Sequence, residues 1–165
     1  MDRMKGYIFN CFWLLLPVLA FNALFGARLP AAFQSDIFWR DIPAWIAIPE
    51  NTARIGTLVL PLLMPLGWTS QRQRIGWLLY AVGLALYLAA WLALMLAPES
   101  LWSTSAAGFA AGAYTPLLWL AGIGLIGEGG LMRRYPALQW LYALCCVVFL
   151  AAHNTHALTV YFRLP

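Results

Sequence analysis

The sequence predicts an all-α fold, a polytopic transmembrane helix bundle. Hydrophobic residues form 63% of the 165-residue chain and charged residues only 10%, and the mean hydropathy is +0.75. A soluble domain has about 25% charged residues, and a small one keeps too much surface per volume to bury so many apolar side chains. Lipid is therefore expected to cover much of the surface of a single domain, residues 1–165.

Five apolar segments are predicted to cross the membrane, since a spanning helix needs about 20 mostly apolar residues. Four meet this length directly: residues 7–26, 75–97, 108–127 and 138–162. The fifth apolar run, residues 55–68, is too short alone. It is extended backwards to give a span over 49–69, because Pro49 suits a first helical turn and the Arg54 side chain can reach the headgroups.

The basic residues set the predicted orientation. Cytoplasmic loops are enriched in Lys and Arg, and with five spans three basic clusters fall on one side: Arg3 with Lys5, Arg72 with Arg74, and Arg133 with Arg134. The N-terminus is therefore expected inside and the C-terminus outside, in a multi-pass protein of the cell membrane, by default a prokaryotic one. Cations scattered between apolar runs form no basic stripe, so nucleic acid is excluded as a partner.

Residues 27–48, between spans one and two, are predicted to be an outer interfacial segment. Their prolines and charges prevent a crossing, yet their many large apolar side chains do not suit a solvated loop. Two interpretations stay open, a lid over the bundle formed by residues 36–45 and a simple interfacial anchor. Asp36 and Arg40 are four residues apart and can pair on a short helix.

Small residues and prolines predict the packing within the bundle. Helices in lipid associate through close backbone approach, so Gly108 and Gly112 on span four, with alanines at four-residue spacing on span three, favour spans three and four as the tightest pair. The same faces leave homo-oligomerisation open. Three spans are expected to be interrupted by prolines: Pro17, Pro61 with Pro65, and Pro116.

Polar side chains concentrate on the predicted outer side. Intramembrane polar groups are costly and often functional, and His153 and His156 are three residues apart, on one helix face. We expect any ligand site to face outward. Its candidate residues are His153, His156, Asn22, Glu50, Arg54, Asp36, Asp41, Tyr87 and Trp91.

Four interpretations of the histidine pair compete: structural hydrogen bonding, an organic ligand site, a metal site and a haem site. Zinc needs three or four ligands, so Asp36, Asp41 or Glu50 would have to join the histidines, and no metal-binding motif is present. Two histidines on one face of one helix cannot hold an iron between helices. We therefore predict no metal and assign no cofactor and no catalytic residue.

The leading functional hypothesis is an integral membrane protein that binds or transports a small or lipidic ligand in an outward-facing pocket. A second hypothesis is a small membrane-embedded enzyme acting on a lipid-linked or amphipathic substrate, because histidine with a carboxylate suits acid–base work near neutral pH. A third is an accessory subunit of a membrane complex. The sequence leaves open whether the protein is an enzyme.

Overall fold

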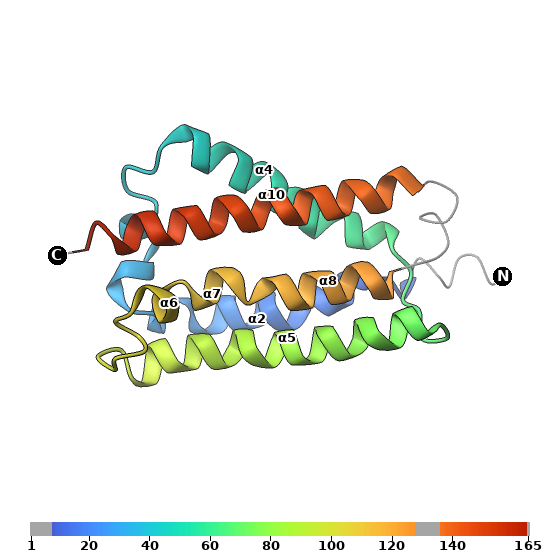
Figure 1. Ribbon diagram of the computed structural model, residues 1–165, viewed down its shortest axis with the longest axis horizontal. Helices are drawn as coiled ribbons and strands as arrows, with labels where there is room; N and C mark the ends of the chain where they lie inside the picture. Colours follow the sequence, from blue (N-terminus) through green and yellow to red (C-terminus); the bar gives the residue numbers. More distant parts are fainter. Residues whose placement is uncertain (1–7, 128–135, 165) are drawn as a thin grey trace.

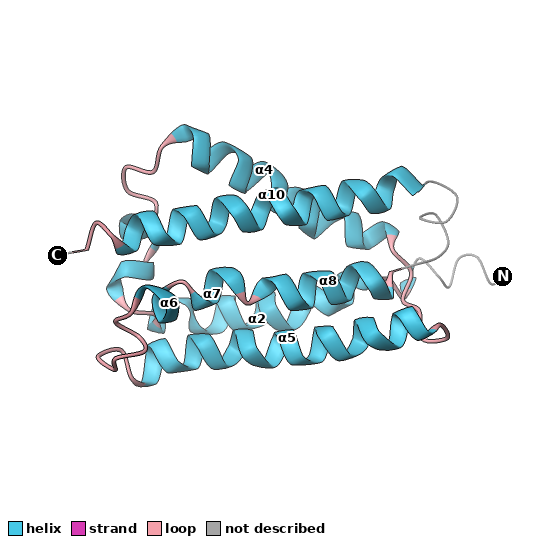
Figure 2. Cartoon of the chain, viewed as in Figure 1, coloured by secondary structure: helices cyan, strands magenta, loops and turns pink. Residues whose placement is uncertain are grey.

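The computed structural model describes residues 8–127 and 136–164, which form helices joined by short connections (Figures 1 and 2). The predicted all-helical fold is confirmed for these residues, which contain no β-strand beyond an isolated bridge between Asn10 and Pro65. Arg3, Lys5, Arg133 and Arg134, on which the predicted orientation partly depends, lie outside the described residues.

The first pass through the bundle begins with 3-10 helix η1 (Cys11–Leu15) and continues as α2 (Leu16–Phe25). The Asn10 side chain caps η1 by accepting a hydrogen bond from the Phe12 backbone N–H over 3.0 Å. Pro17 lies in the first turn of α2, where its missing N–H is tolerated. The predicted interruption is thus a change from 3-10 to α geometry.

The second pass differs from the predicted span over 49–69. Helix α4 covers Ala44–Val59, so Pro49 lies inside it and not in its first turn. Pro43 precedes the helix and its carbonyl accepts from the N–H groups of Ile46 and Ala47. The helix ends before Pro61, the second residue of the 3-10 turn η4 (Leu60–Leu63), because proline cannot continue an α-helical hydrogen-bond ladder.

Helices α5 (Gln71–Leu96) and α8 (Pro116–Ile126) pack closely along their length, as expected for spans three and four. The contact depends on other glycines than predicted. Gly122 lies against the backbone of Gly76 and Tyr80, and Gly83 lies against Leu118 and Trp119. A side chain at any of these three glycines would collide with backbone, so glycine permits the close approach.

The predicted G-x-x-x-G pair plays a different part. Span four is broken into α6 (Ala106–Phe109), α7 (Ala111–Tyr114) and α8, with Pro116 in the first turn of α8. Gly108 contacts Trp102 of the preceding loop, while Gly112 receives the Trp91 ring from α5. Because the helix is interrupted between them, the two glycines do not form one continuous packing face.

The last helix, α10 (Pro136–Tyr161), packs against α4, with Gly56 touching Cys145. Figure 1 shows α4 and α10 side by side, with α2, α5 and α8 as the other layer. Tyr80 and Tyr142 join elements across the core by donating to the backbone carbonyls of Leu14 and Leu120.

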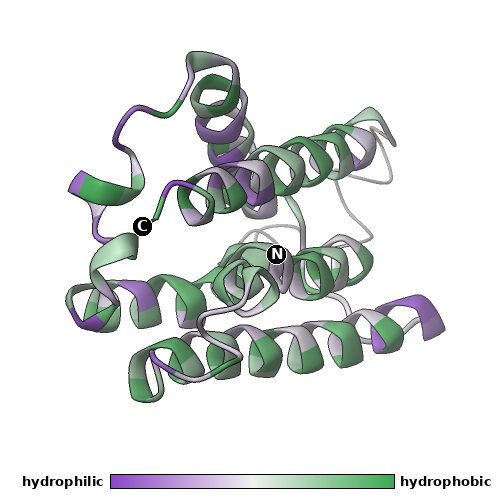
Figure 3. Ribbon diagram, turned by 60° about the vertical axis from the view of Figure 1, so that its left-hand side comes forward, coloured by the Kyte–Doolittle hydropathy of each residue, from purple (hydrophilic) through white to green (hydrophobic). Residues whose placement is uncertain are grey.

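Three helical segments are long and apolar enough to cross a membrane: Cys11–Arg28, Gln71–Leu96 and Ala137–Tyr161. The apolar segment Ala111–Ile126 is shorter. Large apolar side chains on the outer faces remain exposed, among them Leu78, Leu86, Leu144 and Val147. Figure 3 shows apolar residues around the helices and hydrophilic ones mainly at their ends and on α4. These features are those of a membrane protein, since lipid can cover such faces.

Candidate functional site

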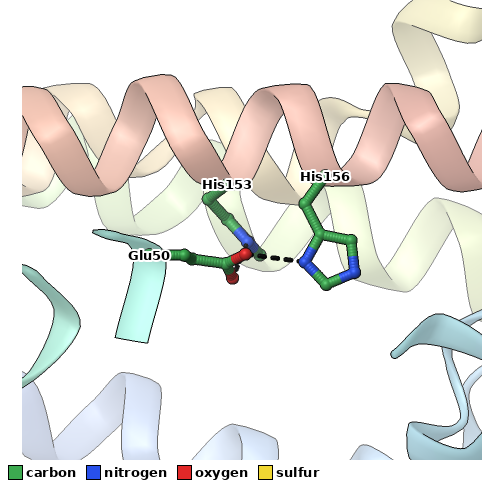
Figure 4. Close-up of side chains that lie close together, drawn as sticks. All are labelled: Glu50, His153 and His156. Carbon is green, nitrogen blue, oxygen red and sulfur yellow. Dashed lines mark hydrogen bonds and ion pairs between the residues drawn. The ribbon is translucent and has the colours of Figure 1, made fainter. Parts of the chain in front are cut away.

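The candidate site is built from the middle of α4 and the C-terminal half of α10. Glu50 comes from α4, and His153 and His156 come from successive turns of α10 (Figure 4). His153 lies about 12 Å along α10 from its end at Tyr161, at 1.5 Å per residue. The site therefore lies nearer to the end of the bundle where α2 and α5 end and α4 begins. It is further from the opposite end, where α5 begins (Figure 1).

The Glu50 carboxylate is the centre of this site and is fully buried. Its Oε1 lies 2.9 Å from Nδ1 of His153, and its Oε2 lies 2.6 Å from Nδ1 of His156. Arg54, one turn further along α4, donates from its guanidinium to Oε1. A buried carboxylate requires such compensation, because an unpaired charge in the interior costs several kcal/mol or more.

These contacts set the smallest number of protons that the group holds. Nε2 of His156 lies 2.8 Å from the backbone carbonyl of Phe38, which only accepts, so this nitrogen carries a proton. Each of the two Glu50–imidazole contacts needs one more proton between nitrogen and oxygen. A carboxylate beside two neutral imidazoles holds two protons and one negative charge, so with three protons Glu50, His153 and His156 have no net negative charge. With Arg54, which donates to Glu50, the cluster of four side chains carries a net positive charge.

Aromatic rings enclose the histidines and Arg54. The Phe38 and Trp39 rings lie 4.1 Å and 4.5 Å from the His156 ring, centroid to centroid. Phe149 stacks on His153 at 5.2 Å. The Arg54 guanidinium carbon lies 5.5 Å from the centre of the Trp39 ring and 5.6 Å from that of Phe149, distances at which a cation is attracted to a ring face.

A cavity of about 330 Å³ adjoins the site. It is within the size range of small-molecule pockets. Five of the residues predicted from the sequence line it: Asn22, Arg54, Tyr87, Trp91 and His153. Asn22 and Tyr87 are hydrogen-bonded to each other across α2 and α5, with the tyrosine hydroxyl donating over 2.8 Å.

Two predicted residues are not brought to the cluster. The side chains of Asp36 and Asp41 are exposed, and among the described residues they form no ion pair with the histidines or with Arg40. Helix α3 (Ser35–Phe38) ends before Arg40, so Asp36 and Arg40 do not share a helix face. Asp41 adopts a left-handed backbone conformation with φ of 53°, and its carbonyl accepts from Arg163.

The segment that carries these acids does fold over the bundle. Phe33 stacks on Phe109 at 4.4 Å and meets Trp91 edge-on at 5.1 Å. Phe38 binds His156 through its carbonyl and its ring. The covering contacts are thus backbone and aromatic, while Trp45, which was included in the predicted lid, is 70% exposed.

Glu50, His153 and His156 could also hold a metal ion, since one ligand atom from each lies within 4.8 Å of the others. The Phe38 carbonyl on His156 resembles the outer partner that orients a metal-binding imidazole. Arg54 opposes this use, because its cation already occupies Glu50 Oε1 and would repel a second one. Two imidazoles and one carboxylate also fall short of a closed four-ligand zinc site.

Phe38 and Trp39 fall within the predicted lid over residues 36–45, but neither they nor Phe149 and Trp119 were predicted as contact residues of the site. Phe149 precedes His153 by four residues, so helical spacing alone places it on the same face. The carbonyl of Phe38 has no signal in the sequence, because any residue supplies the same atom. The chain matches no protein-family model, no curated protein sequence and no solved structure, so the site's geometry carries the functional argument.

Proposed function

We propose that the protein is an integral membrane protein that binds a small or lipidic ligand in a pocket facing the outer side of the membrane. The cavity beside Glu50, His153 and Arg54 carries this proposal, because it joins largely apolar walls to a few convergent polar groups. That combination is typical of ligand sites. Function in transport, sensing or lipid handling is compatible with such a pocket.

The proposed topology has five spans, with the N-terminus inside and the C-terminus outside in the cell membrane. Three spans are the long apolar helices, and the other two are α4 with η4 and the broken segment from α6 to α8. Arg72 and Arg74 lie at the start of α5, away from the candidate site, which supports a cytoplasmic position for that end. The pocket then belongs to the outer half of the bundle.

The decisive experiment is a mass-spectrometric inventory of the small molecules retained by the purified protein. Leu58 lines the cavity, whereas Leu86 is exposed on the apolar outer face of α5. Leu58→Trp should fill the pocket and remove the retained molecule, while Leu86→Trp adds the same ring on the lipid-facing surface and should leave it. Equal retention by both variants would contradict the pocket.

A second candidate function, a membrane-embedded enzyme, is favoured by the placement of His153. Its Nδ1 lies 2.9 Å from Glu50 Oε1, the residue lines the cavity, and among the described residues its Nε2 makes no hydrogen bond. A carboxylate-oriented imidazole beside a cavity is the arrangement of a general base. An enzyme of this kind would lose turnover but keep substrate binding in His153→Asn, whereas a binding protein has no turnover to lose.

A third candidate, the accessory subunit of a membrane complex, predicts that the pocket variants change nothing. In that case the outer apolar faces would be covered by a co-purifying partner protein, and neither Leu58→Trp nor His153→Asn would alter its recovery. Leu58→Trp and His153→Asn therefore separate the three functions when ligand retention, turnover and recovery of a partner protein are all measured.

A further inference from the structure

We infer that the pocket binds the anionic group of an amphipathic molecule, a carboxylate or a phosphate attached to an apolar body, with Arg54 as its charge partner. This inference rests on the proposed ligand-binding function and adds the chemical class of the ligand. The argument uses the charge of the site, the hydrogen-bonding groups that line the cavity, and its apolar walls.

The charge beside the cavity is positive. Glu50, His153 and His156 hold at least three protons and have no net negative charge, so together with Arg54, which donates to Glu50, they form a cluster of net positive charge. The Arg54 side chain is 34% exposed and lines the cavity, and no acidic residue is among the described residues that line it. The acids of the covering segment, Asp36 and Asp41, are exposed and form no ion pair with Arg54 among the described residues. A cation in a site of low polarity favours an anionic partner.

The hydrogen-bonding groups of the cavity are largely donors. Trp119 lines it and is 7% exposed, and its indole N–H is buried with no acceptor among the described residues. The Asn22 carbonyl accepts from Tyr87, which leaves its amide N–H groups for another acceptor. A buried donor without a partner is destabilising, and an oxygen-rich anion supplies acceptors for donors of this kind.

The remainder of the cavity wall is apolar. It consists of aliphatic and aromatic side chains from α2, α4, α8 and α10, including Leu19, Phe21, Leu58, Pro116 and Phe149. The volume of about 330 Å³ equals roughly eleven waters at about 30 Å³ each. An ionic group with a short apolar body fits this space, whereas a bare inorganic anion would leave apolar wall uncovered.

The aromatic rings raise an alternative, since Trp and Phe also line pockets for quaternary ammonium ions. Here the positive Arg54 already lies near the ring of Phe149, which lines the cavity, and near the ring of Trp39 outside it. A second cation in the cavity would be repelled by it, so charge decides in favour of the anion.

The experiment measures binding of four probes with one chain length to the purified protein in a neutral maltoside detergent: decanoate, decyl phosphate, decanol and decyltrimethylammonium. Acetate and inorganic phosphate serve as the same anions without a chain. Isothermal titration calorimetry gives each affinity, with protein-free micelles as the blank. Decanoate and decyl phosphate should bind at least tenfold more tightly than decanol, and the ammonium probe should bind more weakly still.

The variants separate the inference from the proposed function. Arg54→Gln should abolish the preference for anions, while Arg40→Gln, which removes an exposed arginine outside the cavity, should preserve it. Trp119→Phe keeps the ring but removes the N–H, and should weaken the anions severalfold. The wild-type selectivity and Trp119→Phe keep the inference testable if Arg54→Gln fails to fold.

Each result has a distinct meaning. Equal affinity of the wild type for all four chains would support the pocket and overturn the anionic ligand. Binding of acetate or phosphate as tight as that of the long-chain anions would support the charge partner and overturn the amphipathic ligand. No binding of any chain would overturn the proposed pocket itself.

Discussion

Replacing Glu50 tests whether one buried carboxylate organises the site. It accepts hydrogen bonds from Arg54, His153 and His156 and has no exposed surface. Glu50→Ala removes both acceptor oxygens and with them all three hydrogen bonds, and it leaves the cation of Arg54 without its partner. Glu50→Gln keeps an oxygen for Arg54 and His153 and can donate its N–H to Nδ1 of His156.

The expected magnitudes follow from these contacts. Breaking a buried ion pair by removing one partner costs about 3–5 kcal/mol, which we expect for Glu50→Ala. In Glu50→Gln, His156 can give up its shared proton and still donate from Nε2 to Phe38. The remaining loss is the pairing of Arg54, and because that side chain is one-third exposed solvent screening limits the loss to about 1 kcal/mol.

Both variants can be compared by reversible unfolding in mixed micelles of maltoside and dodecyl sulfate. The free energy of unfolding should fall about three times further for Glu50→Ala than for Glu50→Gln. Glu99→Ala, on an exposed acid outside the site, is the control and should leave stability unchanged. If Glu50→Ala unfolds like the wild type, the carboxylate does not hold α4 to α10 and the proton count loses its basis.

Three further predictions concern the packing and the topology. Gly122→Ala should destabilise the bundle by about 1–3 kcal/mol through overpacking, because the added carbon would meet the Gly76 and Tyr80 backbone. Gly26→Ala has open space and should be neutral. Thermal unfolding of the two variants tests this difference in stability. Tyr80→Phe should cost about 1 kcal/mol by removing the hydroxyl that donates to the Leu14 carbonyl, while Tyr114→Phe, at an exposed position, should cost nothing measurable in the same assay. Single cysteines can be placed at Gln71 and Leu164 in a chain whose native cysteines are replaced by serine. They should react with membrane-impermeant maleimide from opposite sides of the membrane. Labelling of both positions from the same side would contradict the five-span topology.

The composition was sufficient to predict the all-helical class and the membrane character, because both depend on the average chemistry of long segments. The spacing of small residues associated spans three and four, and α5 does pack against α8. The details of that contact were missed, since Gly108 and Gly112 match a known spacing but Pro116 and the break at Ala110 separate them from a continuous helix. Local backbone geometry decided which glycines touch, and spacing alone does not encode it.

The candidate site was predicted in part because topology places residues by depth. Asn22, Tyr87 and Trp91 were selected for lying at the level of His153, and they line the same cavity with it. Depth does not give direction around the helix axis. Asp36 therefore lies outside the cluster while Phe38 and Trp39 belong to it, since the covering segment contacts His156 through apolar rings and a main-chain carbonyl.

The separation of Glu50 from its partners in the sequence has a consequence for synthesis of the chain. His153 and His156 follow Glu50 by 103 and 106 residues. At about 5–20 residues per second, the ribosome adds this stretch in roughly 5–20 s. Throughout that interval Arg54 is the one of these three partners of Glu50 that has already been made, so the full cluster can form only after α10 has been synthesised.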